Sequence, residues 1–119
     1  MGLDMGLSSR PKGSTEQAYW RKANQIRGWF ADNLEDFNDN GETKVEKEDL
    51  EALLDTCKKV LDNHDLASDL LPVTEGFFFG NDEYDAIYFD EVEETVEQIN
   101  QILESFDWDA EDMYYWEWY

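Results

Sequence analysis

The residue types most often used in catalysis are scarce in this sequence. It has one cysteine, Cys57, and one histidine, His64. Cys57 falls on an expected helix and His64 follows directly after its end. Seven helical residues span about 10 Å along the helix axis, which is too far for a thiol–imidazole pair. Cys57 lies on the apolar side of that helix, where it acts as a small hydrophobic residue. No zinc set, phosphate-binding loop or nucleophile elbow is present. We therefore predict no catalytic residues and no enzyme activity.

A partial calcium-loop pattern surrounds Gly41. With Gly41 at the sixth position of an EF-hand, Asp36, Asn38 and Asn40 occupy positions one, three and five. The twelfth position, which normally supplies a bidentate Glu, is Lys47. We interpret the segment as a turn between helices and predict no metal site and no cofactor. Weak binding of divalent cations remains an alternative.

Carboxylates dominate the second half of the chain. Residues 60–119 contain eighteen Asp or Glu and no Lys or Arg, and the formal net charge of the chain is -21. Neutralising phosphates requires Lys and Arg, so direct binding to nucleic acid or to an anionic membrane is disfavoured. Such a charge instead speeds association with basic proteins.

An expected helix over residues 85–105 arranges part of this charge in a stripe. Asp90, Glu94, Glu97 and Glu104 recur at helical spacing, and carboxylates four residues apart are separated by about 6 Å along the axis. That spacing is of the same order as the charge spacing of a nucleic-acid strand. We predict a partner-binding surface made of this stripe, the adjacent acids and two C-terminal tryptophans: Asp82, Glu83, Asp85, Asp90, Glu91, Glu94, Glu97, Glu104, Asp109, Glu111, Asp112, Trp116 and Trp118.

Three helices are expected to position these residues. Ser14 and Gln17 have the form of a capping box, which predicts a first helix over about 14–33. A second helix is expected over 46–63 and the third over 85–105, because their apolar residues recur at helical spacing. Residues 64–71 favour a short helical turn that Pro72 closes.

The remaining segments indicate extended structure near the C-terminus. Residues 114–119 are rich in aromatics and suit a strand, and Phe77, Phe78 and Phe79 form a second aromatic run that could pair with it. Residues 1–13, which mix Gly, Ser and Pro, favour an irregular arm. The sequence thus predicts a compact α+β protein, with an arm over 1–13 and a single acidic domain over 14–119.

The sequence contains no evident export signal. One cysteine cannot form an internal disulfide, and no apolar run approaches the length of a membrane helix. The first ten residues lack the basic and apolar regions of a signal peptide. We therefore expect a reducing cytoplasm.

Several segments carry a family resemblance. The chain begins MGLDM, continues with AYWRKANQIRGWF at 18–30 and LLDTCKKVL at 53–61, and has LLP at 70–72 followed by GFFFGNDEYD at 76–85. In these motifs it resembles a family of small phage and prophage proteins of unassigned function. The sequence departs from the family pattern at Arg27, where other members tend to have His.

The resemblance implies a phage origin and hence a bacterial host cytoplasm. Our functional hypothesis is a non-catalytic inhibitor that mimics nucleic acid and binds a basic host protein, such as a nuclease, a CRISPR effector or another nucleic-acid-binding defence protein. The alternative is a protein-interaction module that binds a regulatory or oligomerising surface of a host protein through Trp108, Trp116 and Trp118. A steep loss of binding with salt would favour the first hypothesis.

Overall fold

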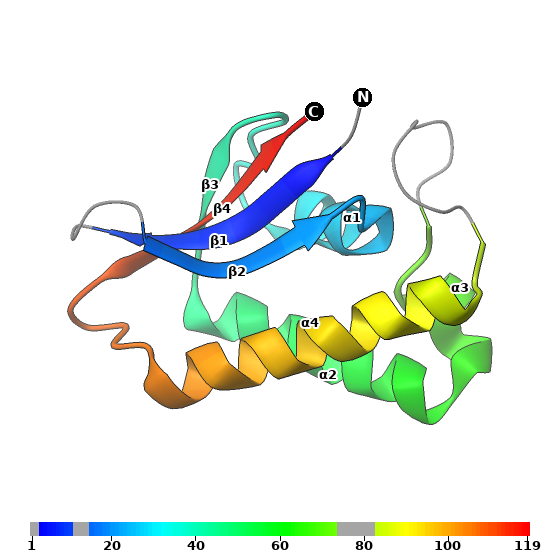
Figure 1. Ribbon diagram of the computed structural model, residues 1–119. Coiled ribbons are helices and arrows are strands. Elements are labelled where there is room, and N and C mark those ends of the chain that lie inside the picture. The colour runs from blue at the N-terminus through cyan, green and yellow to red at the C-terminus, as the bar shows by residue number, and fades with distance from the viewer. Residues whose placement is uncertain (1–2, 11–14, 74–82) are drawn as a thin grey trace.

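The chain folds into a four-stranded β-sheet with helices packed on one of its faces (Figure 1). The computed structural model describes residues 3–10, 15–73 and 83–119. The elements in chain order are β1 (Asp4–Arg10), β2 (Thr15–Arg21), α1 (Asn24–Asn33), β3 (Glu42–Val45), α2 (Lys47–Asp62), a 3₁₀ turn (His64–Leu66), α3 (Ala67–Leu70), α4 (Ala86–Ser105) and β4 (Asp112–Trp118).

The sheet joins the two ends of the described chain. Its strand order is β2-β1-β4-β3, and every neighbouring pair is antiparallel. β1 pairs with β4 along its whole length, from Asp4 opposite Trp118 to Arg10 opposite Asp112. The two central strands therefore come from opposite ends of the sequence.

The core lies between the sheet and the helices. Alternate residues of the central strands, among them Met5, Leu7 and Tyr115, are fully buried on the helix side. Phe30 of α1 stacks on Tyr115 with ring centroids 4.3 Å apart. α2 and α4 lie side by side beneath this layer (Figure 1). Cys57 is fully buried in the same core, as expected from its place on α2.

Side-chain hydrogen bonds fix α4 to its surroundings. The Trp20 indole N–H donates to the Thr95 hydroxyl at 2.8 Å, and the Tyr88 hydroxyl donates to the Leu71 carbonyl at 2.6 Å. Asp85 caps the helix by accepting from the Tyr88 amide. These bonds determine which side of α4 faces water.

The second and third predicted helices are confirmed. α2 begins with a capping box between Glu46 and Asp49, and α4 begins at Ala86 and ends at Ser105. The short turn before Pro72 is also present, as the 3₁₀ turn and α3. In both long helices the apolar residues recur over many turns, so local periodicity and burial agree.

The prediction for the N-terminal third was wrong in two places. Residues 4–10 are the central strand β1 rather than part of an irregular arm, because Met5 and Leu7 alternate with small residues and enter the core. Residues 15–21 are strand β2 rather than the first turns of a helix, which begins only at Asn24. Pairing with β1 outweighs the local helical pattern, and Ser14 of the expected capping box lies outside the described residues.

The C-terminal strand is confirmed, with partners that the sequence did not reveal. β4 lies between β1 and β3, and β3 was not predicted. The expected partner, Phe77 to Phe79, lies outside the described residues. Helices and an antiparallel sheet share one core, which confirms the predicted α+β class of a compact single domain. Within the described ranges, no helix combines the length and apolarity needed to cross a bilayer.

Candidate functional site

The exposed side of α4 carries a row of carboxylates. Its buried side consists of Tyr88, Val92, Thr95, Ile99 and Ile102. The opposite side exposes five acids, which we call the acidic helix face: Asp90, Glu93, Glu94, Glu97 and Glu104. The predicted stripe is therefore confirmed as a solvent-facing surface, with Glu93 added to it.

The acidic helix face has no compensating charge nearby. In the part of the chain that the structure describes, none of its five carboxylates forms an ion pair with Lys or Arg. By contrast, Asp55 on α2 pairs with Lys59 one turn later at 2.9 Å. Like charges three or four residues apart on a helix repel one another. The face is thus a concentration of unpaired negative charge on a rigid element.

Glu91 differs from its neighbours on α4. It is half-buried, and its carboxylate accepts a hydrogen bond from the Gln25 amide at 3.0 Å. Burial is the main cause that raises the pKa of Glu91, and the nearby charges of Glu94 and Asp85 raise it further, whereas the Gln25 bond opposes them. We therefore assign Glu91 to the support of the acidic helix face rather than to its contact surface.

Acids from two segments meet beyond the C-terminal end of α4. A shallow pocket of about 470 Å³ is lined by the start of α2 and by the turn that leads into β4. Its carboxylates are those of Glu46, Glu48, Asp107, Asp109, Glu111 and Asp112. Glu46 and Glu48 were not among the predicted site residues. In the sequence they only mark the start of a helix, and nothing there indicates that the turn before β4 packs beside them.

The predicted surface is divided by the fold. Trp118 lies on the face of the sheet opposite the helices and is 68% exposed, and Trp116 lies half-buried on the same face. Asp85 serves as the cap of α4 and Glu83 is exposed just before it, whereas Asp82 lies outside the described residues. The tryptophans therefore do not belong to the same surface as the acidic helix face.

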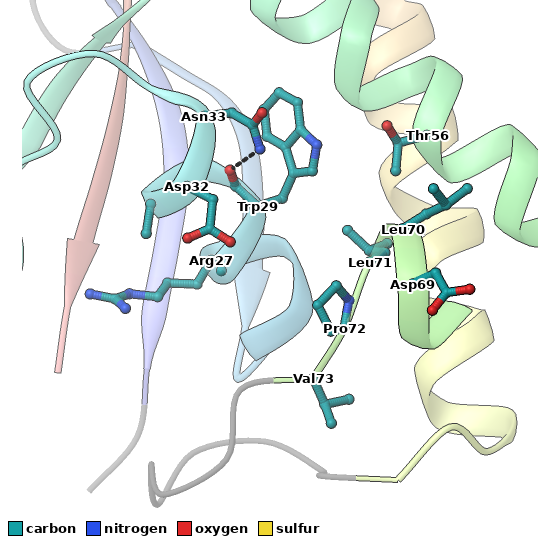
Figure 2. Close-up of a pocket in the computed structure, with 12 residues that line it drawn as sticks. Arg27, Trp29, Asp32, Asn33, Thr56, Asp69, Leu70, Leu71, Pro72 and Val73 are labelled. Carbon is teal, nitrogen blue, oxygen red and sulfur yellow. Dashed lines mark hydrogen bonds between the residues drawn. The ribbon is translucent and has the colours of Figure 1, made fainter. Parts of the chain in front are cut away.

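A second pocket, of about 630 Å³, lies between α1 and residues 69–73 (Figure 2). Figure 2 shows the Arg27 guanidinium turned away from Leu71 and Pro72 and toward the strands. The lining residues include no histidine, cysteine, serine or lysine. We assign no reaction to this pocket.

Arg27 belongs instead to a buried ion pair. Its guanidinium donates to both carboxylate oxygens of Glu117, at 3.0 and 3.1 Å, and the Glu117 side chain is fully buried. Tyr115 and the Asn40 amide also donate to that carboxylate, at 2.9 and 2.7 Å. These bonds join α1, the turn before β3 and the end of β4.

The polar side chains of the turn around Gly41 form hydrogen bonds within the protein. The Asn40 side-chain oxygen accepts from the Tyr119 amide at 2.9 Å, and the Asn38 side-chain amide donates to the Glu42 carbonyl at 2.6 Å. Within the described residues, no group of three or more His, Cys, Asp or Glu side chains is arranged to hold a metal ion. The turn uses its polar atoms to fix its own shape.

The Cys57 thiol shows no sign of activation. Burial raises the pKa of Cys57 to about 12, so the nucleophilic thiolate is not formed at neutral pH. His64 is exposed and stacks on the Phe89 ring, with centroids 3.7 Å apart. The structure thus gives both residues packing contacts.

Comparison with known proteins identified no relative. No family model, curated protein or solved structure matches the chain.

Proposed function

We propose that this protein is a non-catalytic inhibitor that binds the basic, nucleic-acid-binding surface of a host protein. The observation that carries the proposal is the acidic helix face, whose five exposed carboxylates lack Lys or Arg partners among the described residues. A basic partner surface would supply the missing charge.

The geometry of α4 suits a surface that normally holds a phosphate backbone. The helix has 20 residues, and at about 1.5 Å per residue it is about 30 Å long. Asp90, Glu94 and Glu97 repeat at intervals of about 4.5–6 Å along the axis, which is of the same order as the spacing of about 3.4 Å between charges along one nucleic-acid strand. Because the helix is anchored to the core by several hydrogen bonds, it presents these charges without first having to be ordered.

The stability cost of these charges also favours a binding role. Asp90 with Glu94 and Glu93 with Glu97 are like-charge pairs four residues apart, and each costs about 0.2–0.5 kcal/mol. No described cation offsets this cost at the helix surface. A solvated surface of mixed sign would maintain solubility without the same repulsion.

The resemblance to small phage proteins suggests the setting of this activity. We propose that the protein acts in the cytoplasm of a bacterial host. Its partners there would be a nuclease, a CRISPR effector or another nucleic-acid-binding defence protein. Such partners present the Arg and Lys clusters that the acidic helix face would neutralise.

Affinity capture from a bacterial lysate tests the proposal. The bait is the wild-type protein or the triple variant Asp90→Lys, Glu94→Lys and Glu97→Lys. The control variant, Glu51→Lys, Asp62→Lys and Asp65→Lys, makes the same charge change on exposed positions of α2 and the 3₁₀ turn that follows it. We expect the wild type to capture a nucleic-acid-binding protein that duplex DNA or high salt releases, and the α4 variant to lose it.

Two results would contradict the proposal. One is capture that persists after charge reversal on α4. The other is capture that neither salt nor DNA weakens, because a contact between charged surfaces is screened by salt.

A further inference from the structure

The face of the sheet opposite the helices is a second surface with a different character. Among the described residues, no helix or strand packs on it (Figure 1). The strand registers place one set of alternating residues on this open sheet face: Asp4, Gly6, Ser8, Arg10, Glu16, Tyr19, Arg21, Glu42, Lys44, Asp112, Tyr114, Trp116 and Trp118. None of these residues belongs to the acidic helix face.

Aromatic rings form a platform across the open sheet face. Trp118 is 68% exposed and Tyr19 is 38% exposed. Trp116 of β4 reaches across Gly6 of β1 to Tyr19 of β2, with ring centroids 6.3 Å apart. Exposed Trp and Tyr side chains are the types most enriched at the centres of protein interfaces.

The charges on this face nearly balance, in contrast to the rest of the protein. Three bases, Arg10, Arg21 and Lys44, stand among four acids, Asp4, Glu16, Glu42 and Asp112, which gives 3 - 4 = -1 for the face. The formal charge of the whole chain is -21. Arg10 forms an ion pair with Glu42, and the Lys44 Nζ lies 3.7 Å from a carboxylate oxygen of Asp112. The open sheet face is therefore a surface on which a second strongly acidic molecule meets little repulsion.

The edges of the sheet are less suitable for association. At the β2 edge, the Tyr19 amide already donates to the Gln98 side chain of α4 at 2.9 Å. The opposite edge is β3, which has only four residues and carries Lys44 at its centre. Short edges and edge lysines oppose strand addition, so association through this sheet would use its face.

We propose that the open sheet face binds a second copy of this chain, in a two-fold symmetric dimer. β2 carries Glu16 near one end and Arg21 at the other, and neither forms an ion pair with a described residue. When two β2 strands lie antiparallel across a two-fold axis, each Arg21 faces the Glu16 of the other copy. The surface is therefore complementary to itself, as a two-fold interface requires.

This arrangement also separates the strongest charges. Layers in stacked sheets and helices are about 10 Å apart, so the two acidic helix faces would lie at least about 30 Å from each other. That distance is several times the Debye length of about 8 Å at physiological ionic strength. Both acidic helix faces would remain exposed, pointing in opposite directions.

Sedimentation equilibrium over a range of protein concentrations tests the dimer. We expect the mass to rise from the 14.0 kDa of one chain to twice that value. Added salt should change the dimer little, because the acidic helix faces already lie beyond the Debye length and the aromatic contacts are not screened. Salt weakens the proposed contact with a basic partner, so the two proposals can fail independently.

Substitutions locate the interface. We expect Trp118→Glu to weaken the dimer by more than about tenfold, whereas Ile87→Glu, which changes a 58% exposed residue on α4, leaves it unchanged. Glu16→Arg alone should weaken the dimer, and adding Arg21→Glu should restore it. Circular dichroism of each variant checks that the fold is retained.

Three results would overturn the proposal. The first is a monomer at every concentration and salt, and the second is a dimer that Trp118→Glu does not affect. The third is a monomer whose capture of a different protein depends on Trp118, which would assign the open sheet face to that protein.

Discussion

At the scale of single residues, the most consequential contact is the buried pair of Arg27 and Glu117. Their side chains are 9% and 0% exposed. Two charges removed from water need each other, because either one alone is costly to bury. Arg27 thus supplies the cation that neutralises a carboxylate of β4.

Replacing Glu117 should therefore destabilise the fold. We expect Glu117→Gln to lower the free energy of unfolding by about 1–3 kcal/mol, since it removes the buried charge to which Arg27, Tyr115 and the Asn40 amide donate, whereas Arg27 keeps its second ion pair, with Asp39 at 2.8 Å. Urea denaturation followed by tryptophan fluorescence measures the loss. Glu104→Gln, an exposed acid on α4, is the control and should change stability by less than about 0.5 kcal/mol.

Removing the charge of Glu91 should instead stabilise the protein. Because the pKa of Glu91 is raised by burial in the folded state, its ionisation opposes folding, and that penalty grows as the pH rises through the folded pKa. Glu91→Gln keeps an acceptor for Gln25 and removes the charge. We expect a higher melting temperature than wild type at pH 7, with the difference shrinking in acid, where Glu91 is protonated. An equal difference at both pH values would contradict this cause.

At the scale of elements, the close pairing of β1 with its neighbours depends on Gly6. A Cβ built at this position lies 2.5 Å from the Ala18 carbonyl oxygen and 2.8 Å from the Trp116 indole nitrogen. The absence of a side chain lets Trp116 lie over β1. The contact between Trp116 and Tyr19 across β1 is a consequence of this single glycine.

Even the smallest side chain at this position should thus be harmful. We expect Gly6→Ala to lower the free energy of unfolding by about 1–3 kcal/mol, because the backbone of β2 has to move away. Thermal or urea unfolding measures the effect. Gly41→Ala is the matched control, since its Cβ would come no closer than 3.4 Å to any neighbour, and a loss as large as that of Gly6→Ala would refute the steric explanation.

The elements differ in how far the sequence could predict them. α2 and α4 have apolar residues at helical spacing over 16 and 20 residues, and this local signal agrees with their tertiary contacts. β1 and β2, by contrast, contain Gly, Ser and Gln, which do not favour a strand locally. These segments become strands because they pair with neighbouring strands. Their pairing with each other and with β4 is non-local, so no local pattern could reveal it.

The candidate site was predictable to a similar extent. The stripe on α4 follows from helical spacing alone. The sequence could not show that Glu46 and Glu48 lie beside the turn after α4, or that Trp116 and Trp118 lie on the other side of the sheet. Both facts depend on which elements pack together, and the partner-binding role of these residues remains a prediction.

At the scale of the whole molecule, charge is distributed unevenly between two sides. The helix side carries unpaired acids, whereas the open sheet face carries aromatics and nearly balanced charge. The concentrated negative charge and the exposed aromatic rings thus lie on separate surfaces. The proposed basic partner and the proposed second copy of the chain would therefore bind to separate surfaces.

The charge on α4 should be measurable as a loss of stability. We expect the triple variant Asp90→Asn, Glu94→Gln and Glu97→Gln to gain about 0.5–1 kcal/mol of unfolding free energy at low salt, because it removes like-charge pairs. The gain should shrink as added salt screens the repulsion. Asp55→Asn is the contrasting control, since that acid has a cationic partner in Lys59 and its removal should bring no gain.

The pairing of β1 with β4 has a consequence for how the chain folds. Asp4 pairs with Trp118 and Arg10 with Asp112, so the centre of the sheet forms only when two segments at opposite ends of the described sequence meet. Closing so long a loop is slow compared with forming a helix or a hairpin. The hairpin of β1 with β2 and the helices are local and can form early. The docking of β4 would then be the rate-limiting event, and until it occurs the apolar side of β1 stays exposed to aggregation.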